Sequence, residues 1–287
     1  MSEIVDPILV VSDSFLGRFG LDAGRRLPDV AHAIGLDVVY RQVESYEGAL
    51  LRIKGVPRGC VVINSAIREE SRQQFTLAHE IGHFVLPDQQ DLSAPCARDS
   101  IENWDEELKS PELDANRFAA EILMPRPLLQ AHLRSEPSFE SLRSIAGLCG
   151  TSLTASGFQL VALTSFRASL VWSKRRRVRW YRSSDDFVRW VKKGELSEST
   201  FASDCFKGRE VPNGFEPVPA SVWLFEKGLT EDAKIWEHSV SLPGYDAVLT
   251  LLVMREAVET WSDTPDSLNE FDPREFTLER RRWPSKR

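Results

Sequence analysis

Apolar residues recur at helical spacing between positions 71 and 87, on nearly every side of the helix that this spacing predicts. They form two stripes, with Phe75, Ala78, Gly82 and Val85 along one and Leu77, Ile81 and Phe84 along the other. Ser71 and Gln74 match a capping box, in which two side chains satisfy amides of the first turn, and Pro87 marks the end. The pattern therefore predicts a helix that is buried on most sides.

A second helix is delimited by the residues on either side of it. Ser110 can cap its start, Pro111 suits the first helical position and Pro125 ends it. Ala115 and Ala119 are small residues on one face, which would let another helix approach closely. We therefore expect the two helices to pack against each other.

Outside these helices, short extended runs alternate with short helical patterns, which predicts an α+β fold. Three strands are expected before the first helix and five more after the second, the latter in a mostly antiparallel sheet: residues 37–43, 48–53, 60–64, 168–173, 178–182, 221–225, 235–240 and 247–254. Further helices are expected at residues 28–34, 128–134, 139–148, 152–163 and 185–192, and no regular element is assigned before residue 25.

These changes of pattern divide the chain into four parts. We expect a first domain with the small sheet at residues 1–130, a helical connector at 131–165, a C-terminal α+β domain at 166–258 and a poorly ordered tail at 259–287. Residues 87–110 predict a loop over the cleft, with a short helix near 101–108. Residues 146–153 weakly match the turn of a helix-turn-helix unit.

The first helix carries a compact group of chemically active side chains. His79 and His83 are four residues apart, so they lie one turn apart on the same face and can hold one ion, with Glu80 beside them. Zinc peptidases use this arrangement, in which the metal activates a water and the Glu moves its proton to the leaving amine. The alternative is a core helix whose histidines only form hydrogen bonds. With five histidines in the chain, this spacing is improbable by chance.

A third protein ligand is expected, because catalytic zinc takes three and leaves the fourth position for water. On the second helix, Glu112 and Asn116 project from an otherwise apolar stripe, whereas Asp114 lies among the charges of a solvated face. Glu112 is therefore the predicted ligand and Asp114 the alternative. Glu112 could also serve only to stabilise the start of the helix. Asn116 is predicted to orient a histidine ligand through a hydrogen bond.

The two motifs together resemble those of the ImmA/IrrE family of metallo-endopeptidases. The resemblance extends over about residues 36 to 130, and it is specific because two separated motifs, at residues 72–83 and 112–125, agree. It implies a zincin-like peptidase domain, made of a small sheet and the active-site helices. In some members of this family the C-terminal domain resembles a GAF-like sensor, which the resemblance extends to residues 166–258.

The resemblance places zinc ligands on His79, His83 and Glu112 and the general base on Glu80. Zn²⁺ is the expected ion, and Mn²⁺ or Fe²⁺ also suits two histidines and one carboxylate. Known members cut helix-turn-helix repressors that silence mobile-element or DNA-damage genes, so a similar repressor is the expected protein substrate. Many members carry a DNA-binding module, and none is clear before the peptidase motif here.

A peptidase must hold its substrate extended, and an exposed sheet edge can pair with the substrate backbone. The strand at residues 60–64 directly precedes the first helix, which makes four of its residues candidates for substrate binding: Val61, Val62, Ile63 and Asn64. The alternative is that this strand lies inside the sheet. A side chain that stabilises the oxyanion is also expected, and the sequence leaves four candidates: Tyr40, Tyr46, His132 and His238.

The formal charge of −7, from 36 basic and 43 acidic residues, argues against binding of nucleic acid through overall charge. Two local candidates remain. One is a basic hairpin tip at residues 174–177 flanked by Trp172, Trp180 and Tyr181, and the other is the helix pair at 139–163. Packing roles are favoured for both, since sheet aromatics are usually core and residues 152–163 lack Arg and Lys.

The four cysteines lie far apart and predict reduced thiols: Cys60, Cys96, Cys149 and Cys205. The chain shows no signal-peptide pattern and no run of eighteen apolar residues, so a cytoplasmic protein that does not enter a membrane is expected. Cys96 lies between the two ligand helices and could reach the ion as a redox-sensitive inhibitor. An ordinary thiol is the favoured interpretation.

Two other classes of function remain open. In one, the metal site is structural or vestigial, and the protein senses a ligand through residues 166–258 or binds DNA through residues 139–163. In the other, the same site hydrolyses a small amide, which would need a closed pocket.

Overall fold

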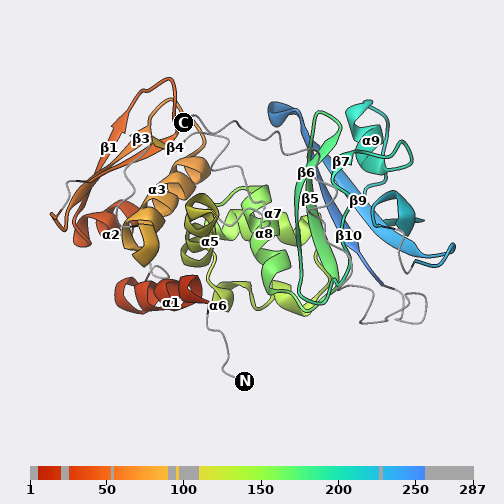
Figure 1. Ribbon diagram of the computed structural model, residues 1–287, viewed down its shortest axis with the longest axis horizontal. Coiled ribbons are helices and arrows are strands. Elements are labelled where there is room, and N and C mark those ends of the chain that lie inside the picture. The colour runs from red at the N-terminus through yellow and green to blue at the C-terminus, as the bar shows by residue number, and fades with distance from the viewer. Residues whose placement is uncertain are drawn as a thin grey trace, which may run out of the picture.

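A computed structural model describes residues 6–20, 26–52, 55–89, 95–96, 110–225 and 229–255. Two sheets lie at opposite ends of the molecule, and helices α3, α5, α7 and α8 lie between them (Figure 1). The predicted α+β class is confirmed, whereas the domain boundaries at 130, 165 and 258 stay predictions. The predicted loop helix at 101–108 and the tail after 258 lie outside the described residues.

The first sheet has four strands in the order β1-β3-β2-β4. Their bounds are Leu36–Arg41 for β1, Gly48–Arg52 for β2, Gly59–Asn64 for β3 and Pro95–Cys96 for β4. β1 and β3 are parallel, while β2 runs antiparallel to both β3 and β4. The sheet is therefore mixed, and β2 connects the strand before the metal-site helix to the short strand β4.

Strand β3 lies inside this sheet, so the prediction that Val61, Val62, Ile63 and Asn64 bind substrate at a free edge is wrong. β1 pairs with one side of β3 and β2 with the other, which occupies the backbone groups that a substrate would need. Val61 and Ile63 are fully buried. The amide of Asn64 instead donates to the carbonyls of Val43 and Tyr46, at 2.8 and 3.0 Å, and so fastens the connection to β2.

Helix α3, Glu70–Val85, is buried from Phe75 to His83, as its apolar pattern predicts. It begins after Glu69 without a side-chain cap, so the predicted capping box is wrong because Ser71 already lies inside the helix. Helix α5, Pro111–Leu123, starts as predicted, with the Ser110 hydroxyl accepting the Leu113 amide at 3.2 Å. A Cβ on Gly82 would lie 3.1 Å from the Ala115 Cα, which shows how closely α3 and α5 approach.

Two further helices precede the first sheet in the sequence. α2, Leu27–Ala33, forms close to its predicted position, with Pro28 in its first turn. α1, Pro7–Phe19, has no counterpart among the predicted elements. Asp6 accepts the Ile8 amide at its start, and Gly20 ends it in the left-handed conformation. Phe15 of α1 packs edge-on against Phe118 of α5, with ring centroids 5.4 Å apart, so α1 supports the second metal-site helix.

The connector differs from its prediction at the start. The single helix expected at 128–134 is two short pieces, α6 at Arg126–Leu129 and a 3₁₀ turn, η2, at His132–Arg134. α7, Phe139–Cys149, and α8, Leu153–Leu163, follow as predicted and meet at an angle of 110°. Within the described segments, no single helix has the length and apolarity to cross a membrane, although α7 and α8 would pass that test as one bent pair.

Helix α8 packs inside the protein and is not displayed for DNA. Ser156 is fully buried and Gln159 is 2% exposed, so these two polar side chains cannot reach base edges, and Thr154 is half-buried. A Cβ on Gly157 would lie 2.9 Å from Leu142 and 3.1 Å from Leu170, which places α8 directly between α7 and the second sheet. The favoured packing role of residues 152–163 agrees with these contacts.

The second sheet has six antiparallel strands in the order β7-β6-β5-β10-β9-β8. Their bounds are Ala168–Lys174 for β5, Arg177–Ser183 for β6, Gly194–Glu195 for β7, Glu216–Pro219 for β8, Lys234–Leu242 for β9 and Ala247–Val253 for β10. The antiparallel arrangement is therefore as expected. One face of the sheet packs on the helical layer, and the other carries α9, Phe201–Phe206, which no prediction includes.

Two predicted elements of this domain are wrong. Residues 185–192 form turns, and Val191 makes a single β-bridge to Leu224. Phe187 and Val191 are both buried in the hydrophobic cluster that also includes Ala202 of α9. The strand expected at 221–225 is replaced by β8, which lies earlier, and by 3₁₀ turn η3 at Ala220–Val222. A further 3₁₀ turn, η4 at Pro243–Tyr245, joins β9 to β10.

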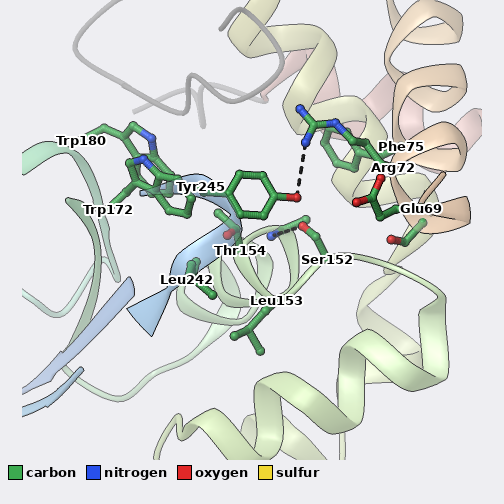
Figure 2. A pocket seen from close by; sticks show the side chains of 12 residues that line it. Glu69, Arg72, Phe75, Ser152, Leu153, Thr154, Trp172, Trp180, Leu242 and Tyr245 are labelled. Carbon is green, nitrogen blue, oxygen red and sulfur yellow. Dashed lines mark hydrogen bonds between the residues drawn. The ribbon is translucent and has the colours of Figure 1, made fainter. Parts of the chain in front are cut away.

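A cavity of about 220 Å³ lies where the second sheet meets α3 and α8. The indole rings of Trp172 and Trp180 stack on one side of it, with ring centroids 5.9 Å apart (Figure 2). The hydroxyl of Tyr245 accepts a hydrogen bond from the guanidinium of Arg72 on α3, at 3.3 Å. Trp172 and Trp180 are 6% and 3% exposed, so two of the three aromatics that flank the basic hairpin are core residues, and Tyr181 is half-buried. This finding agrees with the favoured packing role of the hairpin.

Arg72 also forms a nearly buried ion pair with Glu47, with nitrogen–oxygen distances of 2.8 and 2.6 Å. We expect Arg72→Leu to lower the free energy of unfolding by about 3–5 kcal/mol, because it leaves the Glu47 carboxylate buried without its partner. Urea denaturation measures the change. In the double variant Arg72→Leu, Glu47→Gln most of the loss should be recovered, and equal losses in both proteins would contradict a role for the ion pair.

Candidate metal centre

Helices α3 and α5 bring the three predicted ligands to one point. The rings of His79 and His83, one turn apart on α3, stand at 88° to each other, and their Nε2 atoms are 2.9 Å apart. Glu112, in the first turn of α5, places one carboxylate oxygen 3.2 Å from Nε2 of His79 and the other 3.6 Å from Nε2 of His83. The structure thus gathers two imidazoles and one carboxylate around a common centre.

The outer nitrogens of both rings are held by side-chain amides. Nδ1 of His79 lies 2.9 Å from Oδ1 of Asn116, and Nδ1 of His83 lies 2.5 Å from Oε1 of Gln89. The Gln89 amide is oriented by its own donation to the Pro111 carbonyl at 3.1 Å. Because both amide oxygens accept, each Nδ1 carries the hydrogen and each Nε2 presents a lone pair to the centre. Asn116 therefore occupies the place that its prediction gave it.

This arrangement fits a divalent cation. The Nε2 atoms of the two histidines are 2.9 Å apart and both face the Glu112 carboxylate. Their lone pairs repel each other and the carboxylate unless a positive charge lies between them. Among the described residues, both oxygens of Glu80 and Oε2 of Glu112 are buried and lack a hydrogen-bond partner. Buried polar atoms normally have partners, so these orphaned oxygens point to a missing group of positive charge. Neutral histidine and carboxylate are the donors that zinc prefers.

The electrostatics of the site favour positive charge at the same centre. Burial raises the pKa of the Glu80 carboxyl above its usual range, and the nearby histidines oppose this only in part. Burial would also raise the pKa of Glu112, but its contacts with His79 and His83 prevail and hold that pKa well below its usual range. For His83 the contact with Glu112 outweighs burial and raises the pKa. The carboxylate of Glu112 thus stabilises cations beside it.

Cys96 is a fourth potential ligand at this centre. Its Sγ lies 3.6 Å from Nε2 of His83, and one ligand atom each from Cys96, His79, His83 and Glu112 fall within 4.8 Å of one another. Burial, followed by the charges of Glu80 and Glu112, raises the pKa of its thiol. The sequence favours an ordinary thiol at this position. Cys96 is indeed buried, but it also lies within the ligand cluster.

The other candidates lie elsewhere. Asp114, the alternative ligand, is outside the cluster of possible ligands found in the described segments. Of the four oxyanion candidates, His238 packs between Phe139 and Phe215 on the second sheet, and His132 faces Ser144 in the connector. Tyr40 is 47% exposed on β1. Tyr46 is half-buried between β1 and β2, where its carbonyl accepts the Asn64 amide.

Sequence reasoning missed Gln89 and Gly48. Gln89 lies in 3₁₀ turn η1, Pro87–Gln89, directly after α3, and no local pattern marks it as a partner of His83. Gly48 begins β2, where a Cβ would come within 2.5 Å of Oε1 of Glu80. Only glycine therefore allows β2 to pass so close to this carboxylate, and a glycine at a strand start is the single signal that the sequence offers.

Two histidines on one turn of a helix, a glutamate beside the first and a carboxylate from a second helix define the site of an HEXXH metallopeptidase. The comparisons agree with this class. Residues 31–155 match the family described as the IrrE N-terminal-like domain. This segment of the chain is therefore similar to the metallopeptidase domain of the ImmA/IrrE family.

A relative from Deinococcus radiodurans, the radiation response metalloprotease IrrE, is 39% identical over 106 residues. The matched region is 36% of this chain and 31% of that protein, so the chain matches under a third of the relative's length. The family match over residues 31–155 includes all four residues of the possible metal cluster.

We expect Asn116→Leu to weaken metal binding by roughly 10- to 100-fold, the usual cost of removing a partner that orients a ligating histidine. Competition with a chromophoric chelator measures the affinity. Asn116→Asp keeps an acceptor oxygen near Nδ1 of His79 and should retain most of it. An unchanged affinity in Asn116→Leu would mean that the hydrogen bond does not position His79.

Proposed function

We propose that this protein is a zinc-dependent endopeptidase. The observation that carries the proposal is the buried Glu80 carboxylate, whose oxygens form no hydrogen bond of ordinary geometry among the described residues and which lies close enough to His79 and His83 to interact with their charges. A structural metal site has no use for such a carboxylate. Catalysis does, because a general base must keep a free oxygen for the proton that it accepts.

His79, His83 and Glu112 would hold the ion, and Asn116 and Gln89 would fix the two rings. When bound, a zinc ion supplies a Lewis acid that activates water and polarises the scissile carbonyl. Glu80 accepts the proton of the attacking water and then delivers it to the leaving amine. Mn²⁺ or Fe²⁺ suits the same three ligands, so metal analysis of the purified protein decides among the ions.

The proposed substrate is a helix-turn-helix repressor, and the proposed setting is a stress or mobile-element response in the cytoplasm. The match of residues 31–155 to the IrrE N-terminal-like domain supports the substrate, and the name of the Deinococcus relative, a radiation response metalloprotease, supports the stress response. Cleavage of a repressor would switch genes on without any contact between this protein and DNA. The burial of α8 and of the hairpin tryptophans supports such an indirect role over direct binding of nucleic acid.

Co-expression with a helix-turn-helix repressor encoded beside its gene tests this function. We expect intact-mass analysis to show one defined cut in the repressor, and a chelator to prevent the cut until zinc is restored. A protein that binds one metal ion per chain but cuts no repressor under any inducing condition would contradict the proposed substrate. A protein that binds no metal would contradict the proposed chemistry.

The alternative is a regulatory sensor in which the C-terminal sheet is a GAF-like ligand-binding domain. The cavity between the stacked tryptophans and α3 is the observation that favours it, because an occupant there would contact the metal-site helix directly (Figure 2). Metal analysis combined with a DNA band-shift assay separates the two functions. A sensor without catalysis would shift DNA and leave the repressor intact.

A further inference from the structure

We infer that Cys96 is a fourth protein ligand to the ion and that it keeps the peptidase latent. The inference rests on the proposed function, since it concerns the same centre. His79, His83, Glu112 and Cys96 together offer two nitrogens, one oxygen and one sulfur within 4.8 Å of one another. Four such donors complete the tetrahedral set of a closed zinc site, whereas a catalytic site keeps one position for water.

Backbone pairing holds Cys96 in place. β4 pairs with β2 in antiparallel register, with Cys96 opposite Gly48, and the Glu47 amide donates to the Cys96 carbonyl at 3.1 Å. Gly48 is also the residue whose missing Cβ leaves room for the Glu80 carboxylate. The thiol is therefore brought by the sheet to the side of the centre where the general base lies. Its side chain is 3% exposed, which excludes bulk water from that side.

The same short strand occupies the position that an extended substrate would need. β3 covers one edge of β2, and β4 covers the other edge at Gly48 and Ala49, next to Glu80. An extended peptide can bind to a protein by adding a strand to an exposed sheet edge. β4 thus imitates a bound substrate at this edge, while its cysteine fills the position of the attacking water. Displacement of β4 would therefore free both the edge of β2 and the fourth position on the ion.

The exchange balances without an oxidant or reductant. The metal–sulfur bond breaks, the sulfur takes up one proton from solvent as it leaves, and a water molecule enters the open position. A thiolate is a strong ligand for zinc, so the closed state should bind the ion more tightly than the open one. The latent form would therefore keep the ion tightly bound, and the enzyme would become active only when β4 separates from β2.

Cobalt substitution tests the sulfur ligand directly. The full-length protein is loaded with one equivalent of Co²⁺, and its near-ultraviolet spectrum is compared with those of Cys96→Ser and Cys149→Ser. Cys149 is the matched control, because it is a half-buried free thiol at the end of α7 and outside the ligand cluster. We expect a thiolate-to-cobalt charge-transfer band in the wild-type protein and in Cys149→Ser, and its loss in Cys96→Ser.

Two further readouts accompany the spectrum. Zinc should protect Cys96 from iodoacetamide in peptide mapping, and zinc affinity should fall in Cys96→Ser by at least the roughly 10- to 100-fold seen when a ligand loses its orienting partner. Cleavage of the repressor should rise in Cys96→Ser once zinc saturates the site, since water then has the fourth position.

The outcomes separate the two proposals. Wild-type protein that binds cobalt without the sulfur band overturns the inference and leaves the peptidase intact. If the wild-type protein shows the sulfur band but zinc-loaded Cys96→Ser does not cut the repressor, Cys96 remains a metal ligand. The proposed endopeptidase activity, and with it the latency, is then wrong. Failure of every variant to bind a metal overturns both. A band that persists in Cys96→Ser shows that another thiol binds the ion and also overturns the inference.

Discussion

Glu80→Gln is expected to lower the rate of repressor cleavage by about 100- to 10,000-fold or more, the usual contribution of a positioned general base. The amide has nearly the same shape as the carboxylate but cannot accept the proton of the attacking water. Because Glu80 is not one of the three predicted ligands, the variant should still bind one metal ion per chain. Intact-mass analysis of the repressor over time gives the rate, and elemental analysis gives the metal content.

Glu70→Gln is the control for this variant, since Glu70 is an exposed glutamate in the first turn of the same helix. It should cleave at the wild-type rate. Full proteolysis by Glu80→Gln would exclude the proposed mechanism. The only other carboxylate of the described site with a buried oxygen that lacks a hydrogen bond is Glu112, and Glu112 is already a predicted metal ligand. Loss of metal along with activity would instead make Glu80 a ligand.

The metal-site helices could be predicted because their signals are local. The spacing of His79 and His83 fixes their shared face wherever the helix lies, and Ser110 and Pro111 mark the start of α5 within a few residues. The choice of Glu112 over Asp114 also needed only the faces of one helix. Such features depend on neighbours in the sequence, and the structure places all three predicted ligands together.

What the sequence could not supply depends on pairing between distant segments. β3 becomes an interior strand only because β1 joins it from one side, and Cys96 joins the ligands only because β4 pairs with β2. α9 has a similar origin, since the buried Glu237 on β9 accepts the Ala202 amide at its start, at 2.7 Å. A carboxylate 35 residues away leaves no local pattern, and the local signal for this short helix is the Thr200 hydroxyl, which accepts the Ser203 amide at 3.1 Å.

Helix α3 contacts both ends of the molecule: its first turns reach the second sheet, and its later turns carry the histidines of the metal centre. Its first turns carry Arg72, which contacts Tyr245 beside the cavity of the second sheet (Figure 2). Arg72 also pairs with Glu47, and Glu47 donates its amide to Cys96 in β4. A change at Tyr245 would thus reach the strand that holds Cys96 through three contacts. This chain of contacts gives the C-terminal domain a physical route to the metal centre.

Glu112→Ala is expected to remove metal binding at micromolar concentrations of zinc and, with it, all cleavage. The substitution takes away the carboxylate and leaves two imidazoles and the buried thiol of Cys96, whose proton the ion must then displace without the charge of Glu112 nearby. The loss of affinity should therefore exceed the roughly 10- to 100-fold that follows when only an orienting partner is lost. Isothermal titration of the metal-free protein with zinc measures it, and circular dichroism shows whether the helices remain.

Asp114→Ala is the matched control, two residues away in the same turn of α5. Burial raises the pKa of the Asp114 carboxyl, and the nearby Arg117 opposes this. Its side chain is absent from the ligand cluster of the described residues, so zinc affinity and cleavage should stay near the wild-type values. The reverse result, with Asp114→Ala losing the ion and Glu112→Ala keeping it, would mean that α5 turns its other face to the histidines. In that case the contacts of Glu112 with both Nε2 atoms would not describe the working enzyme.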